Sequence, residues 1–289
     1  MTISSSPQPL RRPTPGNKFF QYLIHLPWTW RVTFAYLTVM LFVPIGAMFA
    51  KASTTSPGEF WRIATSPVAL ATYDVTFTTS LLTALVNGIF GTLIAWVLVR
   101  YDFPLKRFID ASVDLPFALP TSVAGLTLAT VYSENGWIGS LLAPLGVEVS
   151  FTRLGVAVAM MFISLPFVVR TVQPVLQEME KEIEEASWSL GASQFQTFTQ
   201  IILPQLFPTI LTGVALGFSR AVGEYGSTVI IASNTPYKDL IAPVLIFQRL
   251  ESYDFAGATV LGTVMLVISL VLLLGINFLQ AWGKQYDEK

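Results

Sequence analysis

Two ionisable residues interrupt an otherwise apolar stretch of this 289-residue sequence. Arg220 and Glu224 lie four positions apart between residues 206 and 232, so on a helix they share a face and can form an ion pair. Charged groups inside a membrane are rare and usually face protein or a water-filled cavity. Arg220 is therefore a candidate source of positive potential on an anion path, with Glu224 fixing its rotamer and limiting its attraction. A structural ion pair that holds two helices together is the alternative.

A second group of polar candidates follows two prolines. Pro116 and Pro120 interrupt an apolar stretch just before Thr121 and Ser122. Proline removes a backbone donor and bends a helix, and backbone groups freed at membrane depth are tolerated where they line a cavity. These residues therefore either line a translocation path or belong to a proline-bent packing helix whose hydroxyls bond to their own turn.

The remaining composition excludes most catalytic chemistry. The chain has no cysteine and a single histidine, His25, which excludes thiol, disulfide and iron–sulfur chemistry and any His-rich metal site. It contains no GxxxxGK[ST] phosphate loop for ATP. Its net charge of −1 offers no basic surplus for nucleic acid. We expect no catalytic residue, no metal and no cofactor bound by this chain.

The elements that position these residues are predicted to be membrane-spanning helices. The chain is 53% hydrophobic and 12% charged, with a mean hydropathy of +0.60, whereas soluble domains carry about 25% charged residues. A spanning helix needs about 20 apolar residues. Six stretches qualify, at about 32–50, 75–99, 111–132, 153–172, 206–232 and 256–280. The predicted fold class is an all-α membrane protein with six transmembrane helices.

The distribution of Lys and Arg predicts the orientation. The two ends of the chain and the 100–110 and 170–205 loops hold 11 of these residues, against 5 in the opposite loops. Positive residues favour the cytoplasmic side, so both termini are expected there. This gives a cytoplasmic tail at 1–31, a six-span domain at 32–280, a cytoplasmic loop at about 173–205 and a second tail at 281–289.

The 173–205 loop is predicted to form two short amphipathic helices joined at a glycine. Apolar residues spaced by three and four make one helical stripe, at Leu176, Met179, Ile183, Ala186 and Leu190. Gly191 suits a left-handed helix end, and Ser193 with Gln196 forms a capping box for a second helix, which Pro204 is expected to end. The many carboxylates of the first helix argue against a lipid surface, so we expect a protein partner.

The same loop resembles the EAA loop of prokaryotic ABC importer permeases, written EAA, three residues, G, nine residues, I, one residue, LP. The matching positions are Glu185, Ala186, Ser187, Gly191, Ile201, Leu203 and Pro204, with Ser187 in place of the second alanine. The resemblance implies that these residues, with Glu184 beside them, dock the chain onto a cytoplasmic ATPase subunit. Glu185 would face basic groups of that subunit, and ATP and Mg would be bound there.

Three longer segments are similar to the T subunit of bacterial sulfate/thiosulfate permeases: DLPFALPTSVAGLTLATVY at 114–132, LPFVVRTVQPVL at 165–176 and RAVGEYGS at 220–227. The similarity covers about residues 30 to 280. It implies sulfate, and thiosulfate, as substrate, and a homologous second permease subunit, two ATPase subunits and an extracytoplasmic sulfate-binding protein as partners. It also implies the bacterial inner membrane, with a plastid envelope as the alternative. Molybdate permeases share the glycine–glutamate–aromatic–glycine pattern, so molybdate is the alternative substrate.

Two other classes compete with this interpretation. A gradient-driven secondary transporter places its site on broken helices at mid-membrane, which explains Pro116 and Arg220 but leaves the helix–glycine–helix loop without a purpose. A membrane-embedded enzyme would need a metal-ligand pair or a serine triad, and the sequence offers neither. The ATP-driven permease is the interpretation that accounts for all of these features.

Overall fold

The computed structural model describes residues 27–287, and within this range every regular element is a helix. Five helices are long and apolar enough to cross a membrane: Trp28–Ala52, Pro67–Arg100, Arg153–Glu178, Gln194–Val222 and Phe255–Ile276. The predicted all-α class is confirmed. The predicted third span, 111–132, is divided among three shorter helices.

The chain divides into two compact units, Met1–Thr54 and Thr55–Lys289. In the first unit, α2 (Trp28–Leu37), a π-helical turn (Thr38–Phe42) and α3 (Val43–Ala52) form one continuous helix. Its most apolar window buries none of its residues within the chain. A helix that is apolar all round requires an apolar environment, and the bilayer provides one.

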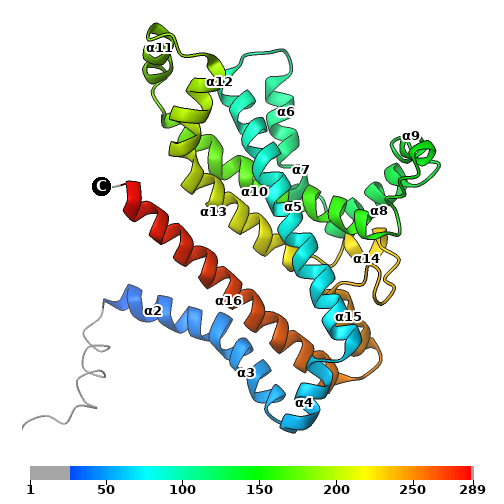
Figure 1. Cartoon of the computed structure of the whole chain (residues 1–289). Helices are drawn as coiled ribbons and strands as arrows, with labels where there is room; N and C mark the ends of the chain where they lie inside the picture. The colour runs from blue at the N-terminus through cyan, green and yellow to red at the C-terminus, as the bar shows by residue number, and fades with distance from the viewer. Residues whose placement is uncertain (1–26, 288–289) are drawn as a thin grey trace, which may run out of the picture. The chain divides into compact units, whose positions relative to one another are not determined.

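The second unit contains all the remaining helices (Figure 1). In chain order these are α4 (Pro57–Ala64), α5 (Pro67–Arg100), α6 (Lys106–Val113), α7 (Leu115–Ala118), α8 (Thr121–Tyr132), α9 (Gly139–Leu142), α10 (Arg153–Glu178), α11 (Lys181–Ser189), α12 (Gln194–Thr197), α13 (Leu203–Val222), α14 (Thr228–Ile231), α15 (Ala242–Glu251) and α16 (Phe255–Asp287). A 3₁₀ turn (Ala143–Leu145) follows α9, and a π-helical turn (Phe198–Ile202) joins α12 to α13. The backbone of α16 is helical through most of the predicted 281–289 tail.

Three long helices, α5, α10 and α13, pack together through small residues. Val168 of α10 is fully buried between Gly91 of α5 and Gly213 of α13, and a Cβ on either glycine would lie 2.9 Å from a Val168 atom. A Cβ on Gly217, four residues further along α13, would lie 3.4 Å from the Ser164 carbonyl oxygen. Helices in membranes associate where small residues let backbones approach. Gly213 and Gly217 therefore serve the packing of α13 against α10 within the chain.

Hydroxyl and amide groups on α5 join it to its neighbours. The Asn87 side-chain amide donates to the Met161 carbonyl oxygen and to Ser164 Oγ, both at 2.9 Å. Thr76 Oγ1 accepts from the Ala242 backbone N–H at 2.8 Å, so it holds the first turn of α15. Polar groups away from water need such partners. This buried polar face of α5 therefore stabilises the bundle.

Prolines explain why the stretch predicted as the third span is broken. Leu119 is extended, with ψ 135°, and separates α7 from α8. Pro120, the next residue, disfavours helical backbone before it, and Pro116 lies in the first turn of α7, where no backbone donor is needed. The predicted interruption just before Thr121 is confirmed, and it is sharper than a bend within one helix.

The fifth span differs from the predicted range of 206–232. The helix is continuous from Gln194 to Val222, so its boundaries are displaced toward the N-terminus and Gly223 ends it. The prediction that Pro204 ends the loop helix is wrong. The π-helical turn before it bonds the Leu203 N–H to the Phe198 carbonyl oxygen, and the helix continues through Pro204 at the point where this wider turn gives way to the α-helix.

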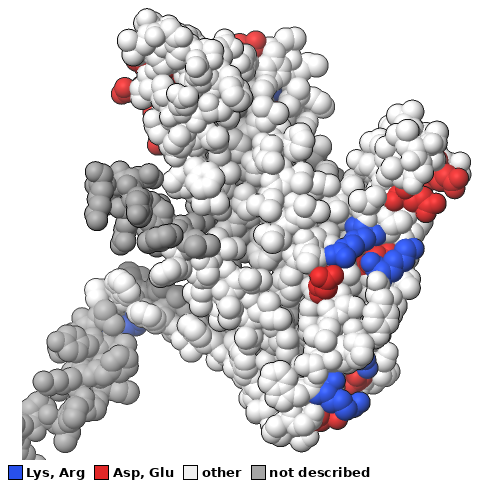
Figure 2. Space-filling model, viewed as in Figure 1, with Lys and Arg blue, Asp and Glu red and all other residues white. Residues whose placement is uncertain are grey.

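Figure 2 shows that this face of the second unit is largely free of charged side chains over the bundle. Acidic groups appear at the end formed by α11, and mixed charges gather near α8, α9, α14 and α15 (Figures 1 and 2). A charge-free band between two charged ends is the pattern of a bundle that crosses a bilayer.

Candidate functional site

The 173–205 loop forms a bent helical hairpin at one end of the bundle (Figure 1). Met179 leaves the helix at the end of α10, with ψ 123°, so the stripe predicted to begin at Leu176 is divided between α10 and α11. Gly191 has φ +88°, which confirms the predicted left-handed bend. The Ser193–Gln196 capping box is also present. We call residues 179–202 the docking loop.

The two halves of the predicted stripe have different environments. Leu176 is fully buried in the chain's own core beside Ile202, which lies outside the stripe, and Met179 packs against that core. In contrast, the docking loop exposes four large apolar side chains, which we call the apolar loop surface: Ile183, Trp188, Leu190 and Phe195. Leu190 is 89% exposed and Phe195 is 75% exposed. Such a patch beside exposed carboxylates is typical of a protein interface.

The residues predicted to dock an ATPase are divided between the outer and inner sides of this loop. Glu185, Ala186, Gly191 and Pro204 are exposed, and Ile201 and Leu203 are half-buried. Glu184 and Ser187 are buried. Glu184 forms an ion pair with Arg100, and Ser187 Oγ lies 2.7 Å from Thr197 Oγ1. The structure thus places Glu184 and Ser187 inside the loop, away from any docking surface.

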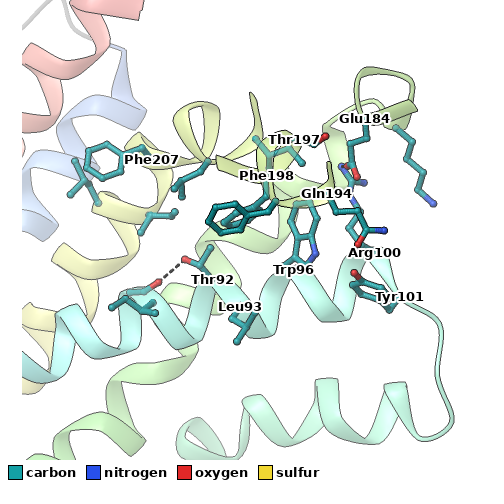
Figure 3. Close-up of a pocket in the computed structure, with 18 of the residues that line it drawn as sticks. Thr92, Leu93, Trp96, Arg100, Tyr101, Glu184, Gln194, Thr197, Phe198 and Phe207 are labelled. Carbon is teal, nitrogen blue, oxygen red and sulfur yellow. Dashed lines mark hydrogen bonds and ion pairs between the residues drawn. The ribbon is translucent and has the colours of Figure 1, made fainter. Parts of the chain in front are cut away.

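A cavity of about 1220 Å³ lies beneath the docking loop. Its lining comes from α5, the loop and α13, and Figure 3 shows Trp96, Arg100, Glu184 and Phe198 around it. Toward the middle of the bundle the lining is aliphatic, with Leu85, Ile89 and Leu211 among its residues.

The second candidate group lies at the break between α13 and α14. Arg220 Nη1 donates to Glu224 Oε2 at 2.8 Å, so the predicted pair forms. Glu224 lies just past the helix end, and its carboxylate is almost fully buried while Arg220 is 31% exposed. The other carboxylate oxygen accepts from the backbone N–H and the hydroxyl of Ser227, at 2.8 and 2.9 Å. Glu224 fixes both the arginine and the turn that follows.

The predicted proline–hydroxyl group is a direct neighbour of this break. A Cβ on Gly125 of α8 would lie 2.6 Å from the Ser227 Cα, and Gly226 lies against Thr121. Pro120 provides no side-chain cap for α8, so the first backbone N–H groups of this helix have no capping partner. Thr121 is half-buried and Ser122 is exposed. Two segments a hundred positions apart thus bring hydroxyls, a helix N-terminus and a half-exposed arginine together.

Sequence reasoning missed a cluster of side chains that ties α10 to α6 and α7. Arg170 donates to both carboxylate oxygens of Asp114, at 2.8 and 2.6 Å, to the carboxylate and carbonyl of Asp110, at 2.6 and 2.8 Å, and to Gln173 Oε1 at 2.5 Å. All five guanidinium donors have acceptors. Asp114 precedes α7 but makes no side-chain capping bond, because its carboxylate accepts from Arg170 instead. The sequence signal that could have revealed this cluster is Arg170 at the end of one apolar stretch, with Asp110 and Asp114 at the start of another.

Among residues 27–287, no group of three or more His, Asp or Glu side chains could hold a metal ion. His25 lies outside the described residues. The described residues instead form an exposed apolar surface on the loop and a polar break inside a helical bundle.

Comparison with known proteins identifies the family. Residues 87–284 match the model of the binding-protein-dependent transport system inner membrane component. A probable sulfate transport system permease protein of Nephroselmis olivacea is 63% identical over 90% of this chain and 91% of its own length. A sulfate transport system permease protein of Synechocystis sp. is 62% identical over 93% of this chain and 94% of its own length.

Solved structures show the same fold at low sequence identity. A bacterial ABC transporter involved in the import of the acidic polysaccharide alginate matches with a TM-score of 0.72 and 18% identity, over 92% of this chain and 96% of that chain. An inward-facing methionine ABC transporter matches with a TM-score of 0.54 and 19% identity, over 78% and 96% of the two chains. The chain therefore belongs to the binding-protein-dependent transport system inner membrane components and, within them, to the sulfate transport system permease proteins.

Proposed function

We propose that this chain is the permease subunit of an ATP-driven importer that carries sulfate, and also thiosulfate, across the bacterial inner membrane. The observation that carries the proposal is the identity of 61 to 63% with sulfate transport system permease proteins over at least 90% of the chain. The alternative of molybdate is less well supported, because the first eight relatives are all sulfate permeases by name.

The anion path runs past the α8 N-terminus and Arg220. A dianion that leaves water needs replacement donors, and uncapped N–H groups at a helix start favour negative charge. Thr121 and Ser122 add hydroxyls, and Pro116 and Pro120 break the helix that would otherwise close this space. Arg220 supplies positive potential, while the Glu224 carboxylate offsets part of it. That offset prevents the path from trapping the ion.

The energy comes from partner subunits. Import of a dianion against about 100 mV costs about 5 kcal/mol before any concentration gradient. Of the two ATPase subunits, which hold ATP and Mg, one docks on the apolar loop surface and on exposed Glu185 of this chain. A homologous second permease subunit completes the membrane path, and an extracytoplasmic sulfate-binding protein delivers the ion. The chain itself holds no cofactor in this scheme.

Transport by a reconstituted complex tests the proposal. The chain is purified with its partner subunits, placed in proteoliposomes, and assayed for ATP-dependent uptake of radiolabelled sulfate with the loaded binding protein present. We expect sulfate to stimulate ATP hydrolysis and thiosulfate to compete with it. Stimulation by molybdate without competition from sulfate would refute the substrate, and uptake without ATP would refute the importer class.

A further inference from the structure

A buried ion pair joins the docking loop to the end of a membrane helix. Arg100, the last residue of α5, lies 2.8 Å from Glu184 of α11 through its Nη2 atom. The two side chains are only 8% and 11% exposed. Figure 3 shows them facing each other beside the cavity. Two charges this far from water have lost their hydration, and their attraction offsets this cost only if the surrounding fold keeps them in good geometry.

The same guanidinium contacts the hinge between α10 and the docking loop. Nη2 donates to the Met179 carbonyl oxygen at 3.3 Å, and Met179 is the residue at which α10 ends. The guanidinium carbon lies 5.7 Å from the Trp96 ring centroid, one helical turn back along α5. One side chain thus meets the end of α5, the hinge and the first half of α11.

The other side of the loop is held by α13. The Ser187–Thr197 hydroxyl contact joins α11 to α12, and α12 continues into α13 without a break. The Trp96 and Phe198 rings meet edge to face at 5.2 Å. Movement of the loop therefore reaches α13 through the backbone, whereas it reaches α5 mainly through side chains.

We propose that Arg100 is a positioning residue that transmits movement of the docking loop into α5. This inference rests on the proposed function, since it assumes an ATPase that moves the loop. Without the ion pair, α11 would follow the ATPase while α5 lagged behind. ATP hydrolysis would then continue with less sulfate moved per ATP. Glu184, although adjacent to the EAA motif, acts inward through Arg100.

Three variants in the full reconstituted complex test the inference. Arg100→Met keeps an unbranched stem beside Trp96, Glu184→Ala removes the partner carboxylate, and the double variant removes both charges so that neither is stranded in the interior. Arg62→Met is the matched control, because Arg62 pairs with Glu59 within exposed α4. The readouts are complex assembly, binding-protein-stimulated ATP hydrolysis and sulfate transported per ATP hydrolysed.

We expect the double variant to assemble and to lose about fivefold or more in sulfate transported per ATP, the scale of a typical coupling between two sites. The control should match the wild type. Wild-type ratios in the assembled double variant, or failure of the double variant to assemble, would show that the pair serves folding alone and would overturn the inference. A wild-type complex that moves no sulfate would instead refute the proposed function.

Discussion

Gly125 offers the sharpest test of the proposed anion path. This glycine lets α8 approach the break after α13, where the backbone of Ser227 faces it. An alanine Cβ at position 125 would lie 2.6 Å from both the Cα and the carbonyl oxygen of Ser227. Neither atom can rotate away, since both belong to the backbone.

The size of the effect follows from this geometry. Ordinary contact begins near 3.4 Å, so a separation of 2.6 Å forces α8 and the break apart by about 0.8 Å. Insertion of one methyl group into a packed interior costs about 1 to 3 kcal/mol. The same displacement would move Thr121 relative to Arg220, because Thr121 lies at the start of the same helix. We expect Gly125→Ala to lower both thermal stability and sulfate uptake.

Gly223→Ala is the matched control within the same site. A Cβ there would meet only the Ser219 carbonyl oxygen, at 3.9 Å, and its φ of −85° suits any residue. Thermal unfolding of the purified complex and proteoliposome uptake are measured for both variants. Equal behaviour of the two alanine variants would show that α8 does not rest on the break, and the combined site would have to be abandoned.

Four further predictions use the same complex. Gly191→Val should lower ATPase-coupled uptake but allow membrane insertion, because a β-branched residue at positive φ costs about 1 to 3 kcal/mol. Gly146→Val is the control, since Gly146 also has a positive φ and no atom within 4 Å of its Cβ position. Equal uptake in the two variants would refute the docking bend. Arg220→Gln should lower uptake by about tenfold, since a hydrogen bond to a charged group contributes about 1.5 to 3 kcal/mol. Glu224→Gln should change turnover more than assembly; if both variants only prevent assembly or leave uptake unchanged, the pair has no role in conduction. The hydrogen bond from Arg170 lowers the pKa of Asp110. The stability that this carboxylate gives the folded chain is therefore complete above the unfolded-state pKa of about 4 and is lost as pH falls through the lower folded-state pKa. Thermal melts at decreasing pH should show this loss of stability, and Asp110→Asn should remove this pH dependence.

The sequence predicted the local features of this fold well, namely a left-handed glycine, a capping box and a proline break. Gly191 and the Ser193 capping box appear where their residue types require them, because both depend on a few neighbouring positions. The prolines at 116 and 120 broke their stretch for the same reason. A local steric rule transfers from sequence to structure without knowledge of the rest of the chain.

Long-range partners could not be predicted in this way. Glu184 and Glu185 are adjacent and chemically identical, and only the position of Arg100, more than 80 residues earlier, directs the first inward. The proximity of Thr121 to the α13–α14 break depends on glycine contacts between two distant segments. Helix periodicity shows which residues share a face, but it does not show what that face meets.

The helix Gln194–Val222 links the docking loop to the proposed anion path, and its geometry is that of a lever with its pivot between the two ends. It is continuous over 29 residues, and a Cβ on its Gly213 would lie 2.9 Å from the Val168 Cα of α10. At 1.5 Å per residue, about 28 Å of helix lies on the loop side of that contact and about 14 Å on the other. Rotation about a fulcrum at Gly213 would move the two ends in opposite directions. An inward displacement of about 2 Å at the loop would therefore become an outward displacement of about 1 Å beside Arg220. One stiff element would close the bundle at the docking loop and open its far end in the same movement.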